Sequence, residues 1–177
     1  FKAELIMLIR KGKKWLWIIN CIGMLLLVIL PVKTAHQIIL PVLWFLQVSR
    51  LSNLTTKETT NNVYYFVFTS FKPLTRLLVS QLLAAQFLML TLALPLIIRL
   101  LIALNFTGAI SILLGSIFIV LLAALLGVLT KGKKLFEVLF FLLAYTNINK
   151  ISFADYFGGF EHNTFYFAWL CLLIVIF

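Results

Sequence analysis

The sequence predicts an all-α polytopic membrane protein, folded as a single transmembrane domain over residues 1–177, and the composition carries that prediction. Hydrophobic residues make up 63% of the chain, whereas charged residues make up only 11%. Soluble domains are roughly 45–50% apolar and about 25% charged, so this chain lacks the polar side chains that would cover a soluble surface. At roughly 20 apolar residues per crossing of a ~30 Å hydrocarbon core, we expect about six transmembrane helices, preceded by an amphipathic interfacial helix.

The amino-terminal residues 1–13, FKAELIMLIRKGK, place apolar side chains at helical spacing with charged residues between them. This pattern predicts a short amphipathic helix in the headgroup plane, with a cytosolic extension of the first span as the alternative. The first span follows over about 15–31, with tryptophans at its inner end and Pro31 at its outer end. Indole rings favour the membrane interface, which supports this placement. A second span returns over about 37–51.

The polar stretch 52–62, SNLTTKETTNN, interrupts this apolar chain and contains a single aliphatic side chain, Leu54. A third span starts near Leu74 and continues for roughly thirty residues. At ~1.5 Å per residue, this helix is longer than the hydrocarbon core is thick, so we expect it to tilt, kink or project. Pro95 is the expected kink, because proline removes one helical hydrogen bond.

The rest of the chain predicts three further spans. The fourth, about 109–129, carries small residues such as Gly115, which we interpret as general helix packing, with a dedicated dimer face as the alternative. A short fifth span over about 135–149 overlaps an aromatic, re-entrant-like outer segment at 146–163. The sixth starts near Thr164 and is cut off at the last residue, so we expect the chain to be a fragment, or the ordered part, of something longer.

The distribution of positive charge predicts the orientation. With the amino terminus inside, only Lys33, Arg99 and Lys150 of the 15 lysines and arginines lie towards the outer face. The positive-inside bias favours this arrangement. We therefore predict a multi-pass protein of the cell membrane (inner or plasma), with a cytoplasmic amino terminus and the polar stretch in the cytosol. The net charge is +10, and many of the basic residues directly flank apolar runs. We therefore expect contact with the lipid bilayer and no nucleic-acid binding.

Catalytic and metal-binding patterns are almost absent from the sequence. GVLTKGKK at 127–134 approaches a phosphate-binding loop, but Lys134 replaces the hydroxyl that holds Mg²⁺ and a membrane helix precedes it. We interpret it as a basic inner flank. Asp155, Glu161 and His162 could form a weak metal or acid–base site, with a solvated outer loop preferred. The expectation is a non-catalytic chain that binds no cofactor or metal itself.

Two ionisable residues fall within predicted spans. Arg99 lies near the outer end of the third span, where its stem is expected to snorkel to the headgroups, with contact to an anionic substrate or lipid as the alternative. If Arg99 snorkels, replacing it with leucine would leave assembly intact. Glu137 lies near the start of the fifth span and is expected to pair with Lys133 or Lys134.

The order of these features resembles the membrane (permease) subunit of type-2 ABC exporters. The matching features are an amphipathic amino-terminal helix, two spans, the sequence TKET at 56–59, an aromatic stretch at 63–68, and a basic, proline-containing entry at 69–76 into a very long span. The resemblance covers nearly the whole chain, and it includes the short fifth span with its outer segment.

This resemblance implies that residues 52–72 form a cytoplasmic coupling segment. The segment would dock on a separate cytosolic ABC ATPase subunit, which would hold ATP and Mg²⁺, while a second permease subunit, identical or related, would pair with this one. The implied function is export of an amphiphilic substrate (peptide, lipid or drug) from the cytoplasm. A secondary transporter or channel without an ATPase is the main alternative; a membrane-embedded enzyme and a scaffold are the others. The residues expected to carry the coupling are Thr56, Lys57, Glu58, Thr59, Tyr64 and Tyr65.

Overall fold

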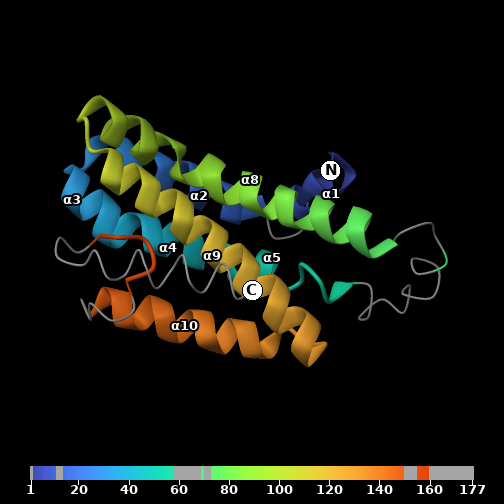
Figure 1. The fold of residues 1–177 in the computed structure, drawn as a ribbon. Helices are drawn as coiled ribbons and strands as arrows, with labels where there is room; N and C mark the ends of the chain where they lie inside the picture. Colours follow the sequence, from blue (N-terminus) through green and yellow to red (C-terminus); the bar gives the residue numbers. More distant parts are fainter. Residues whose placement is uncertain (1, 11–13, 58–68, 70–72, 150–154, 160–177) are drawn as a thin grey trace.

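The fold is a bundle of helices, seen in a computed structural model that describes residues 2–10, 14–57, 69, 73–149 and 155–159 (Figure 1). These residues contain no strand, which confirms the predicted all-α class for the part described. The helices are α1 (Lys2–Arg10), α2 (Lys14–Ile29), α3 (Val32–Thr34), the π-helical η1 (Ala35–Ile39), α4 (Leu40–Phe45), α5 (Val48–Leu51), α8 (Pro73–Ile102), α9 (Phe106–Thr130) and α10 (Lys134–Ile148).

Two of these helices, α8 and α9, are long and apolar enough to cross a membrane. The pair α1 and α2, which meet at 99°, would add a third if it counts as one bent span. The prediction of about six spans is therefore wrong for the described residues. The predicted second span is divided into short helices, and α10 has 15 residues, or about 22 Å at ~1.5 Å per residue, less than the hydrocarbon core. The predicted sixth span at 164–177 lies outside the described residues.

The regular α-helix is interrupted within residues 32–51, and we attribute the first interruption to Pro41. The N–H of Leu40 donates to the carbonyl oxygen of Ala35, five residues back, which makes a wide π-helical turn directly before the proline. Proline has no N–H and its ring crowds the preceding turn, so a local widening is a common response. After α4 the backbone tightens through Leu46 and Gln47 before α5 begins.

A short turn joins α8 to α9, between the predicted third and fourth spans. Helix α8 continues through Pro95 and ends at Ile102, and Leu104 then adopts a left-handed backbone with φ of 56°. Asn105 caps α9, because its side-chain oxygen accepts a hydrogen bond from the N–H of Gly108 at 3.1 Å. This cap allows the chain to reverse direction sharply and returns α9 along α8.

Helices α8 and α9 pack against each other, while α10 packs on α9 and α4, and α1 and α2 pack on α8 (Figure 1). Small side chains of α8, among them Ala84 and Ala85, are fully buried, as is usual where helices pack closely. The side chain of Gln86 donates to the hydroxyl of Ser116 at 2.6 Å across this contact. The core therefore lies between α8, α9 and the helices of 32–51.

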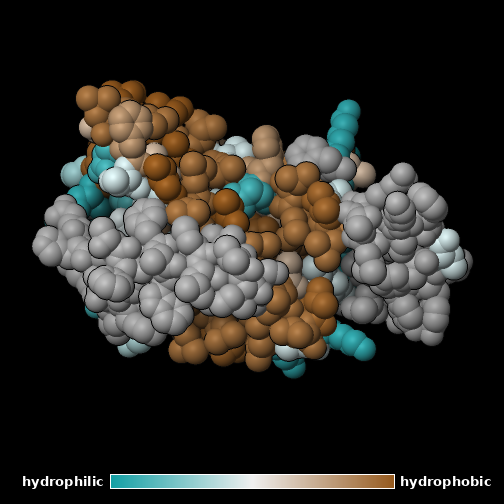
Figure 2. Space-filling model, in the orientation of Figure 1, coloured by the Kyte–Doolittle hydropathy of each residue, from teal (hydrophilic) through white to brown (hydrophobic). Residues whose placement is uncertain are grey.

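The outer surface of the bundle is apolar. In Figure 2 the brown, hydrophobic residues cover most of the coloured surface, and the hydrophilic residues project mainly near its edges. Helix α2 illustrates the pattern, since Ile18, Ile22, Leu25 and Ile29 are exposed along one side. Such a surface suits hydrocarbon rather than water, so the arrangement supports a membrane-embedded protein.

Candidate functional site

The first half of the polar stretch is folded into the bundle. We call residues 52–57 the anchor segment. The hydroxyl of Ser52 donates to the Glu137 carboxylate of α10 at 2.9 Å, and the hydroxyl of Thr55 donates to the carbonyl oxygen of Ala124 in α9 at 3.3 Å. Thr56 is buried, and its hydroxyl donates to the carbonyl oxygen of Ser52 at 3.2 Å. The first two bonds fasten the segment to α10 and α9, which lie 85 and 69 residues further along the chain at these contacts.

A third attachment joins the anchor segment to the amino-terminal helix. The ammonium group of Lys57 forms an ion pair with the carboxylate of Glu4 in α1, and both side chains are less than one-fifth exposed. Helix α1 in turn packs on α8, the helix that follows the polar stretch. The anchor segment is thus tied to α1, α9 and α10 immediately before the chain continues towards α8.

Separating Lys57 from Glu4 should weaken this attachment modestly. We expect Glu4→Gln and Lys57→Gln each to lower the free energy of unfolding, with a coupling energy of about 1 kcal/mol in the double-mutant cycle, because the pair is only partly shielded from solvent. Equilibrium unfolding of the four proteins in mild detergent measures the coupling. Additive effects of the two substitutions would mean that the ion pair does not hold α1 to the anchor segment.

Gly127 makes room for the anchor segment on α9. A Cβ atom at Gly127 would overlap the hydroxyl of Thr55. Nearer the start of α9, a Cβ atom at Gly115 would overlap the backbone carbonyl of Tyr156. These two small residues of the fourth predicted span therefore serve contacts within the chain, in keeping with their interpretation as packing residues.

A buried polar network lies between α2 and the helices of 32–51. The side-chain amide of Gln47 donates to Asn20 at 3.0 Å and accepts from the guanidinium of Arg50 at 2.8 Å. Arg50 is 2% exposed, and its guanidinium carbon lies 4.5 Å from the centre of the Trp17 ring. The indole N–H of Trp17 donates to the carbonyl oxygen of Ile9 at 3.2 Å, which extends the network to α1. We call these residues the Arg50 network.

Sequence reasoning missed the Arg50 network. It placed Arg50 on the cytoplasmic side and Trp17 at the inner membrane interface. The available signal was Asn20, an amide within the apolar run 15–31, because a polar side chain at such a place usually has a partner on a neighbouring helix. The network consists of hydrogen bonds between side chains and a cation–π contact between Arg50 and Trp17. We interpret its role as structural, because these interactions hold α1, α2 and α5 together.

Residues 155–159 close the opposite end of the bundle. A side-chain oxygen of Asp155 accepts from the N–H groups of Phe157 and Gly159, both at 3.2 Å, which forms a tight turn. The side chain of Gln37 donates to the carbonyl oxygen of Gly159 at 2.8 Å. Gly158 has a φ of 67°, and any Cβ there would also overlap Ser111 of α9, so glycine is required on both counts. We call residues 155–159 the outer turn segment, after the predicted outer segment at 146–163 to which they belong.

The outer turn segment is buried rather than solvated. The Tyr156 ring lies among Trp44, Phe140 and Phe157, with ring centres 6.2, 6.1 and 5.2 Å away. Burial raises the pKa of the Tyr156 hydroxyl. Asp155, which the sequence placed in a solvated loop or a weak metal site, is 5% exposed and holds the turn instead. Glu161 and His162 lie outside the described residues, within which no cluster of metal-binding side chains occurs.

His36 connects the π-helical turn to the outer turn segment. Its Nε2 atom lies 3.0 Å from the carbonyl oxygen of Phe157, which can only accept, so Nε2 carries the proton. Burial lowers the pKa of His36 below 6.5, and the hydrogen bond to Phe157 and the charge of Asp155 offset this only in part. The neutral imidazole is therefore the form that suits the folded protein.

Acidification should loosen this connection. Because the pKa of His36 is lower in the folded than in the unfolded chain, the unfolded chain binds more protons, so stability falls as the pH decreases below about 6.5. We expect faster hydrogen exchange at residues 155–159 at pH 5.5 than at pH 7.5, beyond the intrinsic change of exchange chemistry with pH. His36→Gln should remove this difference. An equal pH response in the variant would place its origin elsewhere.

Arg99 is bonded within the chain. Its guanidinium NH1 donates to the carbonyl oxygens of Leu27 and Leu30, at 2.5 and 2.7 Å. These oxygens lie at the end of α2, where the last carbonyls lack helical partners and carry the negative end of the helix dipole. Arg99 therefore caps α2, a role that the sequence did not suggest. Its contact with a substrate or lipid stays a prediction.

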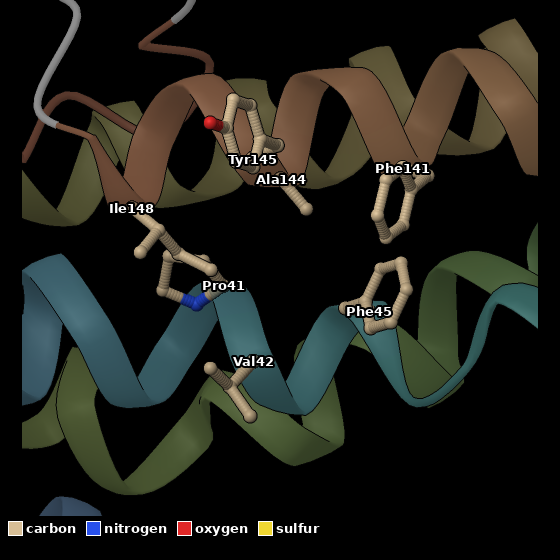
Figure 3. Close-up of a pocket in the computed structure, with 7 residues that line it drawn as sticks. All are labelled: Pro41, Val42, Phe45, Phe141, Ala144, Tyr145 and Ile148. Carbon is tan, nitrogen blue, oxygen red and sulfur yellow. The ribbon is translucent and has the colours of Figure 1, made fainter.

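An apolar cleft of about 100 Å³ lies between α4 and α10 (Figure 3). Its lining residues are Pro41, Val42, Phe45, Phe141, Ala144, Tyr145 and Ile148. Phe45 and Phe141 face each other across it, with ring centres 6.0 Å apart. The lining of the cleft is almost entirely apolar, so the cleft suits packing of an apolar group.

The predicted coupling residues divide at the end of the anchor segment. Thr56 and Lys57 are engaged within the bundle, whereas Glu58, Thr59, Tyr64 and Tyr65 lie outside the described residues. Glu137 accepts from Ser52, and its predicted pairing with Lys133 or Lys134 is not formed in the described part of the chain.

Comparison of this chain with protein-family models, with curated proteins and with solved structures gives no match.

Proposed function

We propose that this chain is the transmembrane subunit of an ATP-driven exporter that moves an amphiphilic substrate (peptide, lipid or drug) out of the cytoplasm. It would act with a separate cytosolic ATPase, which holds ATP and Mg²⁺, and with a second permease subunit. The chain would span the cell membrane several times with its amino terminus in the cytoplasm. It would perform no catalysis itself, since its work is to convert movement of the partner into movement of helices.

The observation that carries this proposal is the attachment of the anchor segment. Ser52, Thr55 and Lys57 fasten it to α10, α9 and α1, and the 30-residue helix α8 follows residues 58–72. Residues 58–72 connect the anchor segment to α8, so a force applied to them would pull or push α8 while the anchor segment is held in place. Since packed helices move as rigid elements, such a force would shift α8 relative to α1, α9 and α10.

The coupling roles would then differ along the predicted residues. Thr56 and Lys57 would act as positioning residues, because the first is buried and the second is paired with Glu4. Glu58, Thr59, Tyr64 and Tyr65 would contact the ATPase, with the carboxylate of Glu58 meeting a cation and the tyrosines anchoring at the interface.

The expectation of an amphiphilic substrate is supported by the surface of the bundle. Large apolar side chains are exposed along α2, α8, α9 and α10, and the buried polar groups of the Arg50 network bond to one another. An ion or sugar pathway would need a continuous polar lining, whereas a molecule with an apolar part could move along these faces within the bilayer.

Reversing the charge of Glu58 tests the proposal. We expect Glu58→Arg to uncouple ATP hydrolysis from export, with export reduced at least ten-fold, while membrane insertion is unchanged. The assay uses the full chain with its ATPase in vesicles and measures phosphate release and substrate transport in parallel. Lys2→Glu serves as the control for charge reversal, because Lys2 is exposed at the start of α1 and its substitution should leave coupling unchanged. Normal coupling in Glu58→Arg would remove Glu58 from the proposed contact.

A further inference from the structure

The turn between α9 and α10 concentrates positive charge. We call residues 131–134 the basic turn. Its three lysines, Lys131, Lys133 and Lys134, are exposed, and none of them forms an ion pair in the described part of the chain. The nearest acid in the sequence, Glu137, accepts a hydrogen bond from Ser52. The charge of the basic turn is therefore available to an external anion.

The backbone of the basic turn adds to the positive charge of its lysines. Lys131 ends α9 in the left-handed conformation, with φ of 48°, and α10 starts three residues later. Lys133, at the cap position of α10, provides no side-chain acceptor for the first N–H groups of that helix. Those groups and the helix dipole present further positive charge beside the lysine ammonium groups.

A hollow of about 660 Å³ lies against the basic turn. Thr130, Gly132, Lys133 and Lys134 form its polar side, and Leu135 and Val138 form an apolar side. Val128 and Leu129, at the end of α9, are exposed nearby. Helix α9 is one of the two helices long and apolar enough to cross a membrane, and a bilayer crossed by α9 would place the hollow where lipid headgroups meet acyl chains.

We propose that the basic turn binds an anionic phospholipid, with the headgroup phosphate on the lysines and the acyl chain along Leu135 and Val138. The apolar side favours a lipid over free phosphate, which would use only the lysines. Lysine clusters at the cytoplasmic end of membrane helices attract anionic headgroups, at about five-fold in affinity for each lysine. This binding does not depend on the proposed transport function, because it needs only the basic turn and a membrane.

Photolabelling with a lipid probe tests the site in the full-length chain. The purified protein in neutral detergent is titrated with short-chain phosphatidylglycerol carrying a photoreactive acyl chain, and the labelled peptides are mapped by mass spectrometry. We expect labels within residues 128–138, and at least a ten-fold loss of affinity in the triple variant Lys131→Gln, Lys133→Gln and Lys134→Gln. The control triple variant Lys2→Gln, Arg10→Gln and Lys14→Gln removes the same charge from α1 and α2, and it should change the affinity less than two-fold.

The alternatives give different results. Equal labelling by a phosphatidylcholine probe, or an equal loss in both triple variants, would overturn the proposal, because either would mean that general hydrophobic or electrostatic attraction explains the binding. Effective competition by millimolar inorganic phosphate would identify free phosphate as the ligand and would also overturn it. Failure of inorganic phosphate to compete, with labels confined to 128–138, supports a lipid. Folding of each variant is checked by circular dichroism and by its elution volume in detergent.

Discussion

Gly115→Val is expected to separate the outer turn segment from α9 and to lower the free energy of unfolding by about 3 kcal/mol. Any Cβ atom at this position overlaps the carbonyl of Tyr156. A backbone carbonyl cannot swing aside as the end of a side chain can, so the whole turn has to move. Its displacement would also break the bond from His36 to Phe157 and the bond from Gln37 to Gly159.

Equilibrium unfolding in detergent measures the effect of this substitution, and hydrogen exchange at residues 155–159 locates it. Gly132→Val is the matched control, since a Cβ atom at Gly132 would meet only Thr130, with its nearest atom 3.5 Å away. We expect the control to change stability by less than about 0.5 kcal/mol. If Gly115→Val were as stable as the parent, the outer turn segment could not pack on α9 as described.

Arg99→Leu is expected to destabilise the protein by about 3 kcal/mol. The substitution removes two charge-assisted hydrogen bonds and leaves the carbonyls of Leu27 and Leu30 without these donors. In an apolar surrounding, unsatisfied carbonyls are costly, so the end of α2 should fray. The contacts with α2 thus reverse the expectation, drawn from the sequence, that leucine at this position leaves assembly intact.

The test compares thermal unfolding of Arg99→Leu with that of Arg99→Lys and Arg10→Leu. Lysine keeps a cationic donor and should recover part of the stability, whereas Arg10 is exposed at the end of α1 and its loss should have little effect. An unchanged unfolding temperature for Arg99→Leu would favour a side chain directed to headgroups. Hydrogen exchange at residues 27–30 separates the loss of the cap from a general effect.

Long apolar runs made most of the helices predictable. The ranges 15–31, 109–129 and 135–149 correspond closely to α2, α9 and α10, because their length and flanking residues leave few alternatives. The range 37–51 was harder. A proline inside a short apolar run does not reveal whether the helix ends, bends or widens, and the structure shows that it widens into a π-helical turn before Pro41.

The site could be predicted less well, because its important contacts join residues far apart in the chain. The polar character of 52–57 was evident, but its attachment to Ala124, Glu137 and Glu4 depends on how α9, α10 and α1 pack. Likewise, nothing local indicates that Arg99 reaches the end of α2, or that Asp155 holds a buried turn. The polar residues could be recognised from the sequence, whereas their bonding partners could be identified only from the three-dimensional structure.

The proposed coupling role is tested most directly by purifying the full chain from its native membrane in mild detergent and quantifying, by mass spectrometry, the cytosolic proteins that accompany it. We predict an ATPase with a phosphate-binding loop, in stoichiometric amount. It should be lost when Glu58 and Thr59 are replaced by arginine and retained when Lys2 and Lys14 are replaced by glutamine. If the chain is recovered without such an ATPase, or if the ATPase is retained in the Glu58 and Thr59 variant, the coupling role is contradicted.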